Sequence, residues 1–277
     1  MQKNTHFQPT MELYLKKLQL HTSKETLNIL TKWMKREKQN LNYFKMKLTK
    51  IKKECHYANL KLSKSILSFQ NFGNISTRID KDNFIIKPSG ADLDKTKYLD
   101  YPVISISKRK KISGKLKESS DTPTHLILYE KYPDLNAIAH AHAKYSVIWA
   151  QALHDIPICG TTHADYWREK IFVTNNLRQE KIKKNYEANI GKSIIGKLGK
   201  RNPLKYPGIL VANHGPFSWG KDAIEALQNL ERLEFIAELA FKTKLLNNKK
   251  TLISTQMVKK HYNRKNGIHA YYGQKNK

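Results

Sequence analysis

The sequence is short of cysteine, of acidic residues and of long apolar runs. Its two cysteines, Cys55 and Cys159, lie far apart and form no CxxC pair, which argues against a disulfide framework or a cysteine-based zinc site. No run approaches the roughly 20 apolar residues of a membrane helix, and the N-terminus lacks the apolar core of a secretory signal. We therefore expect a cytoplasmic protein with no membrane association.

The shortage of acidic residues leaves a large positive charge. The chain has 51 Lys and Arg against 23 Asp and Glu, a formal net charge of +28. Such an excess ordinarily raises nucleic acid as a partner. Here the bases are mostly Lys, spread along the whole chain among Asn and Ile, which is typical of a composition bias. We expect an anionic small-molecule substrate and no nucleic-acid partner.

The 277 residues suffice for one large domain or two small ones. Residues 1–45 are polar and weakly helical, and a second helical period begins at Met46. We expect a folded domain over residues 46–277, preceded by an extension that is either an unstructured leader or the product of a start codon misassigned upstream of Met46. One amphipathic helix in the extension is compatible with the spacing of Leu27, Leu30, Trp33 and Met34.

Residues 119–142 contain a candidate metal site. His140 and His142 alternate within an apolar run, and in a strand both imidazoles would share one face and could hold one divalent ion. Asp121 precedes an expected helix that starts near Pro123 and stops before Pro133, so its carboxylate either joins the metal or caps the helix. His214 follows an expected strand over 209–212 and is a candidate third ligand, although lone histidines are more often structural.

Several polar turns are candidate anion sites. Ser119 and Ser120 would lie at the N-terminus of the expected helix, where they either bind a phosphate or cap the helix. Residues 87–90 (KPSG) and the Gly73-Asn74 pair present polar groups, but each is also compatible with an ordinary turn. The basic run 108–111 is typical of a hairpin turn with solvated charges rather than of a nucleic-acid patch, and Ser113-Gly114 is a further expected turn.

The last third of the chain combines a clear helix with polar segments. Residues 222–246 have a strong helical period and predict a long packing helix. His163 and Asp165 are expected on a polar loop. The C-terminal stretch with His261, Arg264 and Tyr272 has the composition of a mobile tail.

Seven motifs carry a family resemblance: GNIS, IKPSG, SSDTPTH, HAH, GTTHADY, NHGPFSWG and HYNRKNGIHAYYGQ. In order and spacing they resemble the L-ribulose-5-phosphate 4-epimerases of the class II aldolase family, from about Met46 to Gln274. One departure is the Ala212-Asn213 pair, where close epimerases have His-Ser. The resemblance implies an α/β (α+β) fold with a central, mostly antiparallel sheet flanked by helices. It also implies a homotetramer with active sites between subunits and a phosphorylated pentulose substrate.

The resemblance also implies the roles of the site residues. Each subunit would bind one divalent metal through His140, His142 and His214, with Asp121 at the metal site. The metal is usually Zn2+, although Mn2+ and Co2+ suit the same ligands. The positions that match the family's phosphate and substrate contacts are Asn74, Lys87, Ser89, Gly90, Ser119 and Ser120. Asp165 and Tyr272 match the acid and base that act on the two faces of the aldehyde, from a neighbouring subunit, and His261 and Arg264 are candidate supporting residues.

The implied reaction interconverts L-ribulose 5-phosphate and D-xylulose 5-phosphate. Because C4 carries no acidic proton, inversion requires retro-aldol cleavage of the C3–C4 bond, rotation of the aldehyde and re-formation of the bond. Aldolases of the family tend to have Glu where this chain has Asp121. This difference, together with GTTHADY and the full C-terminal motif, favours the epimerase branch over an aldolase of the fuculose-1-phosphate type. A basic nucleic-acid-binding protein on a degenerate aldolase fold is a third alternative, but every matched site residue is intact. The sequence does not separate an arabinose from an ascorbate pathway.

Overall fold

The computed structural model describes residues 24–70, 72–249, 252–268 and 270–272. The chain divides into two compact units, Met1–Lys50 and Ile51–Lys277. Helix α2 (Lys24–Ser63) supplies the described part of the first unit and continues into the second. Residues 24–45 are therefore helical, which differs from the unstructured leader expected for the extension, and residues 1–23 lie outside the described residues. None of the described helices combines the length and apolar character needed to cross a membrane.

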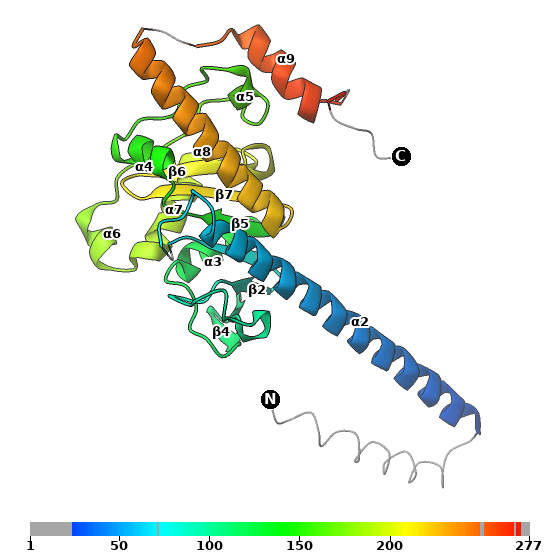
Figure 1. Cartoon of the computed structure of the whole chain (residues 1–277). Helices are drawn as coiled ribbons and strands as arrows, with labels where there is room; N and C mark the ends of the chain where they lie inside the picture. Colours follow the sequence, from blue (N-terminus) through cyan, green and yellow to red (C-terminus); the bar gives the residue numbers. More distant parts are fainter. Residues whose placement is uncertain (1–23, 71, 250–251, 269, 273–277) are drawn as a thin grey trace. The chain divides into compact units, whose positions relative to one another are not determined.

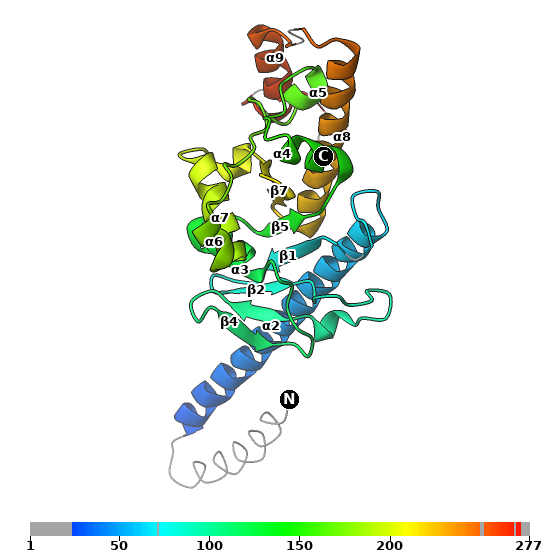
Figure 2. The same cartoon turned by 90° about the vertical axis from the view of Figure 1, so that its left-hand side faces the viewer.

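The second unit is built on one antiparallel sheet in the order β4-β3-β2-β1-β5-β7-β6 (Figure 2). Its strands are β1 (Asn74–Arg78), β2 (Asn83–Ile86), β3 (Val103–Ser105), β4 (Lys110–Ser113), β5 (Ala137–His140), β6 (Gly208–Val211) and β7 (Gly215–Gly220). All six pairings between neighbouring strands are antiparallel. The expected central antiparallel sheet flanked by helices is confirmed.

Helices surround the sheet (Figure 1). They are α3 (Thr122–Lys131), α4 (Lys144–Gln151), α5 (Thr161–Ala164), α6 (Gln179–Lys183), α7 (Tyr186–Leu198), α8 (Ala223–Leu246) and α9 (Thr255–Asn266), with short 3-10 turns at Tyr98–Asp100 and Pro203–Lys205. The predicted α3 and α8 are confirmed, and the Asp222 side chain caps α8 by accepting from the Glu225 N–H. The expected mobile tail contains α9, and the expected loop around His163 contains α5.

The two faces of the sheet pack against different helices. Ala137 and Ala139 of β5 join a cluster with Leu227 and Leu230 of α8, whereas Ile138 joins the cluster that contains buried side chains of α3 and α7. Figure 2 shows α3 and α7 on the other side of the sheet from the first half of α8. Because side chains alternate along a strand, His140 shares the α3 face with Ile138.

Strand register places three residues in one row across the sheet. Asn74 of β1 pairs with His140 of β5, which pairs with Phe217 of β7. Gly73, just before β1, has a φ of +90°, and a Cβ there would lie 2.8 Å from the His140 carbonyl oxygen. Only glycine fits this position without displacing β1 from β5. Gly73 thus leads the chain into the sheet, and Asn74 is the first, buried residue of β1 rather than part of an exposed turn.

The expected hairpin is present in β3 and β4, and its turn overlaps the start of the basic run 108–111. The chain reverses before Lys110, at Arg109, which has a φ of 51° in the left-handed region. Ser113 is the last residue of β4, so the turn expected at Ser113-Gly114 is not the hairpin turn. All four residues of β4 are exposed, as expected for solvated charges.

His163 in α5 is a buried, uncharged imidazole. Its side chain is 3% exposed, its Nε2–H donates to the Glu169 carbonyl at 3.0 Å, and its ring packs edge-on against Trp167. Burial lowers the pKa of His163 from 6.5 to about 4, an effect that hydrogen bonds to backbone carbonyls only partly oppose. The folded state therefore disfavours protonation that the unfolded chain accepts.

The free energy of unfolding should consequently fall as pH drops from about 6.5 towards 4. Between pH 7 and pH 5 we expect the wild-type protein to lose about 2 kcal/mol more unfolding free energy than His163→Gln, which cannot titrate. Urea denaturation at both pH values measures the difference. The matched control is His154→Gln at an exposed histidine, which should lose as much as the wild type. Equal losses in all three proteins would contradict the assignment.

Candidate active site

His140 is the most buried of the candidate metal ligands. It is 1% exposed, and its ring stacks on Phe217 with centroids 4.2 Å apart and an interplanar angle of 15°. Since a carbonyl oxygen only accepts, His140 Nδ1–H donates to the Pro216 carbonyl at 2.9 Å. This hydrogen bond leaves Nε2 with its lone pair, which is the tautomer that a metal ligand needs.

Two further imidazoles converge on His140. One ring nitrogen from each of His140, His142 and His214 lies within 4.8 Å of the other two. The ring centroids are 4.6 to 5.1 Å apart. His140 ends β5, His142 follows two residues later, and His214 lies between β6 and β7. The structure thus brings together the three histidines that the sequence predicted as ligands.

The local environment keeps two of these imidazoles neutral at physiological pH. Burial, reinforced by the neighbouring His140, lowers the pKa of His214 to about 3. Burial and His140 also lower the pKa of His142. A neutral imidazole has a free lone pair, so protons compete little with a metal ion for these nitrogens.

Asp121 directs its carboxylate towards the histidines. It occupies the N-cap position of α3, but its side chain makes no capping hydrogen bond. Instead, Oδ2 accepts from Asn74 Nδ2 at 2.6 Å and lies 3.9 Å from His140 Nε2. Burial acts to raise the pKa of Asp121, but interactions with His140 and His125 and the Asn74 hydrogen bond outweigh it and hold the pKa below its usual range. The carboxylate is ionised beside the three imidazoles, and the simple capping interpretation is wrong.

The predicted phosphate residues lie on two adjoining segments. Residues 87–90 and 117–120 run side by side, with an antiparallel bridge between Pro88 and Glu118. The Ser119 N–H donates to the Lys87 carbonyl at 3.2 Å, and the Ser89 N–H donates to the Lys117 carbonyl at 3.0 Å. The side chain of Lys87 is 5% exposed, and burial lowers its pKa although Asp121 opposes the shift. Lys87 therefore lies close enough to Asp121 to interact with its charge.

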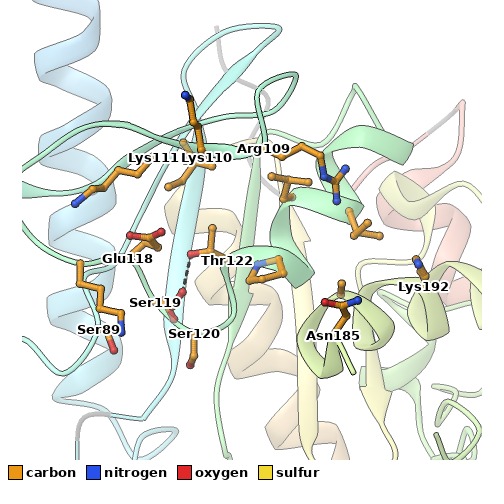
Figure 3. A pocket seen from close by; sticks show the side chains of 16 residues that line it. Ser89, Arg109, Lys110, Lys111, Glu118, Ser119, Ser120, Thr122, Asn185 and Lys192 are labelled. Atoms are coloured by element: carbon orange, nitrogen blue, oxygen red, sulfur yellow. Dashed lines mark hydrogen bonds between the residues drawn. The ribbon is translucent and has the colours of Figure 1, made fainter. Parts of the chain in front are cut away.

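Three of the predicted serines open onto a cavity of about 760 Å³. Figure 3 shows Ser89, Ser119 and Ser120 on one side of it, with Asn185 and Lys192 of the α7 region on the other. Gly90, also predicted, adopts a left-handed conformation with a φ of +60°. The sequence did not identify these cationic or polar lining residues outside the motifs: Arg109, Lys110, Lys111, Lys117, Asn185 and Lys192. The lining includes one carboxylate, Glu118, but its cations outnumber it, and together with the hydroxyls they suit an anionic group.

Asp165 and Tyr272 belong to a second polar cluster, around α9. Asp165 is 6% exposed and pairs with Arg264 through two hydrogen bonds, of 3.0 and 2.7 Å, and with His261 at 3.1 Å. The Tyr272 ring packs on Arg264 and Lys265, with each cation within 5 Å of the ring centroid. Among the described residues, no hydrogen bond, ion pair or ring contact given for this cluster reaches the three histidines. The predicted catalytic pair and its two supporting residues thus lie together, apart from the metal ligands of the same chain.

The donor set fits a divalent metal. Two or three imidazole nitrogens and a carboxylate are ligands that Zn2+, Mn2+ and Co2+ share. The His140–Pro216 hydrogen bond supplies the outer-shell support that metal-binding histidines usually have. The Asp121 carboxylate is largely buried beside the buried His140, so a cation at this position would compensate its desolvated negative charge.

Metal analysis tests this site directly. We expect one divalent ion per chain, and His214→Ala should weaken binding by more than about 100-fold, which is the upper end of losses from outer-shell changes. Elemental analysis and chelator competition measure stoichiometry and affinity. His154→Ala, at an exposed histidine, is the control and should bind as the wild type does. Unchanged affinity in His214→Ala would refute the ligand assignment.

Known proteins share both the fold and the sequence pattern. Residues 53–241 match the family model of the class II aldolase and adducin N-terminal domain. Among solved structures, an L-fuculose 1-phosphate aldolase is 24% identical with a TM-score of 0.65, covering 78% of this chain and 95% of its own. The fold is shared by YgbL from Klebsiella pneumoniae, which is 23% identical with a TM-score of 0.60, covering 76% of this chain and 97% of its own. It is also shared by L-fuculose-1-phosphate aldolase from Thermus thermophilus, which is 18% identical with a TM-score of 0.56, covering 73% of this chain and 99% of its own. The chain belongs to the class II aldolase and adducin family.

Proposed function

We propose that this protein is a metal-dependent L-ribulose-5-phosphate 4-epimerase, which interconverts L-ribulose 5-phosphate and D-xylulose 5-phosphate. The class II aldolase family, the candidate metal site and the phosphate-compatible cavity support a sugar-phosphate enzyme. Within the family, a 4-epimerase needs two proton-transfer groups because the C4 hydroxyls of the two epimers lie on opposite faces.

The contact between α5 and α9 carries the epimerase proposal. Asp165 lies in the GTTHADY motif, and its partners His261 and Arg264 lie in the C-terminal motif almost 100 residues later. These are two of the motifs that favoured the epimerase over an aldolase. Their direct pairing brings the two motifs together at one place, which supports a shared role.

In the proposed reaction, Asp165 and Tyr272 carry out the two proton transfers. Burial acts to raise the pKa of Asp165, but hydrogen bonds from Arg264 and His261 outweigh it, so the group is a carboxylate at neutral pH. It is suited to remove the C4 hydroxyl proton of one epimer as the C3–C4 bond breaks. Tyr272, beside the same arginine, would return a proton to the aldehyde oxygen on the opposite face as the bond re-forms.

Other residues hold the substrate. The hydroxyls of Ser89, Ser119 and Ser120 face the cavity, where they would bind the phosphate, and Gly90 allows its backbone a close approach. Asn74 fixes the Asp121 carboxylate beside the histidines. A divalent ion, for which we propose Zn2+, would act as a Lewis acid that stabilises negative charge on the ketose oxygens.

We further propose a homotetramer in which Asp165 and Tyr272 serve the metal site of a neighbouring subunit. The separation of the two clusters within one chain supports this arrangement. The wholly exposed side chain of Ile268 and the exposed Tyr271, next to Tyr272, also suit a segment that another subunit covers.

An aldolase of the L-fuculose 1-phosphate type is the alternative function. A structure of that enzyme covers 78% of this chain, and the proposed metal and phosphate sites would serve either reaction. The distinction lies in whether the aldehyde is released or re-added to C3.

Product analysis decides between the two. Purified protein incubated with L-ribulose 5-phosphate should form D-xylulose 5-phosphate, detected by a coupled enzyme assay, with a chelator abolishing turnover. Free glycolaldehyde phosphate without epimer would indicate an aldolase. Inactivity with this substrate and cleavage of L-fuculose 1-phosphate would replace the proposed function with the alternative.

Asp165→Asn separates proton transfer from metal binding. Because the amide cannot accept the proton, we expect a loss of about 100-fold to 10,000-fold in kcat, whereas metal content stays unchanged. The control is Asp134→Asn at an exposed aspartate, which should retain wild-type activity. Loss of the metal in Asp165→Asn would show that Asp165 supports the metal site instead.

Mixed oligomers test the inter-subunit arrangement. Asp165→Asn and His214→Ala are each expected to be inactive, but co-expressed subunits would pair an intact Asp165 with an intact histidine cluster across some interfaces. Partial recovery of activity in the mixture supports sites shared between subunits. No recovery, with mixed oligomers present by mass spectrometry, would place each complete site within one chain.

A further inference from the structure

Each of the three clustered imidazoles lies near-parallel to an aromatic ring. His140 stacks on Phe217 at an interplanar angle of 15°, and His142 on Phe72 at 19° with centroids 5.2 Å apart. The third pair is His214 with Tyr186, at 25° and 6.4 Å. Every candidate ligand thus has its own aromatic neighbour, and Tyr186 lies in a segment whose sequence suggested no function.

His214 depends on such a neighbour more than His140 does. The Nδ1–H of His140 is held by the Pro216 carbonyl, which fixes its ring. The Nδ1 of His214 is buried and has no hydrogen-bond partner among the described residues. With no such bond to fix the imidazole, its orientation rests on the rings around it. His140, His142 and Phe217 lie edge-on to it, and Tyr186 lies near-parallel to it.

The backbone around Tyr186 is fixed independently of the site. Asn185 adopts a left-handed conformation with a φ of 56°, and Tyr186 then begins α7. The next residue, Glu187, accepts a hydrogen bond of 2.6 Å from the Thr124 hydroxyl of α3 through its carbonyl. One turn later, Gly191 lies so close to α3 that a Cβ would meet Ile127 at 2.9 Å. The start of α7 is thus held against the start of α3, directly after Asp121.

We propose that Tyr186 is a positioning residue for the metal centre, which acts by holding the His214 imidazole in the orientation that binds the ion. A ring that is free to rotate about its Cβ–Cγ bond must be ordered on metal binding, and a ring already packed in place avoids that loss. The aromatic face performs this function, because ring packing requires no hydroxyl. In this role Tyr186 acts on the ion through the His214 ring, which lies 6.4 Å from its own ring between centroids. The inference rests on the proposed metal site, but not on the identity of the sugar phosphate.

Metal affinity of two variants tests the role. Tyr186→Ala removes the ring, and we expect its affinity for Zn2+ and Co2+, measured by chelator competition, to fall by about 10-fold to 100-fold. Tyr186→Phe keeps the ring and should bind within about twofold of the wild type. The visible spectrum of the bound Co2+ should change in Tyr186→Ala and be restored in Tyr186→Phe. Circular dichroism and thermal melting establish that both variants are folded.

The matched control is Tyr57→Ala, which removes an exposed tyrosine from α2 and should leave affinity unchanged. Wild-type metal affinity in Tyr186→Ala would overturn the inference. An equal loss of metal affinity in Tyr186→Ala and Tyr186→Phe would also overturn it, because the hydroxyl and not the ring would then cause the effect. A wild-type protein without metal affinity would overturn this inference together with the metal site. Metal binding that follows the expected pattern in a protein without epimerase activity would refute only the proposed reaction.

Discussion

The pairing register of β1, β5 and β7 is the constraint on which the candidate active site depends. It aligns Asn74, His140 and Phe217 in one row on the α3 face of the sheet. A slip of one residue in β5 would turn His140 towards the alanine-rich cluster under α8, where its polar nitrogens would find no partner. The same row supplies a hydrogen bond to Asp121 and a stacking surface for His140, so the register sets both the position and the chemistry of the ligands.

The second polar cluster is held by charge rather than by apolar burial. Tyr262 is the one buried residue of α9, whose other described side chains are mostly exposed or half-buried. The helix is instead attached to α5 through the Asp165 carboxylate, which is paired with Arg264, Lys265 and His261. Breaking a desolvated ion pair leaves an uncompensated buried charge, so this attachment is specific even though it buries little apolar surface.

Much of the architecture could be predicted from sequence periodicity, and the exceptions have physical causes. The helices α3 and α8 have apolar residues at helical spacing and clear start signals, so they were identified. Strands β1 and β7 were not: β1 follows directly after Gly73, which has the pattern of a turn, and β7 contains Gly215, Pro216 and Gly220, which have poor strand propensity. Helix α9 was missed because its partner Asp165 lies almost 100 residues earlier. For the site, the histidines and serines were identifiable from their motifs, whereas Tyr186 and Lys192 reach it through the packing of α7 on α3, which local sequence does not encode.

The strand order also has a consequence for how the chain folds. β5 pairs with β1 about 60 residues before it and with β7 about 80 residues after it, so the two pairings at β5 join distant segments, whereas the other four join strands that follow one another in the chain. Such contacts close long loops, which slows folding relative to proteins of local topology. His214 reaches His140 only once β7 has joined β5. During synthesis on the ribosome, the three clustered histidines therefore come together only after more than three quarters of the chain has been made. Until then the nascent chain exposes the edge of β5 that later pairs with β7, and we expect chaperones to protect that edge.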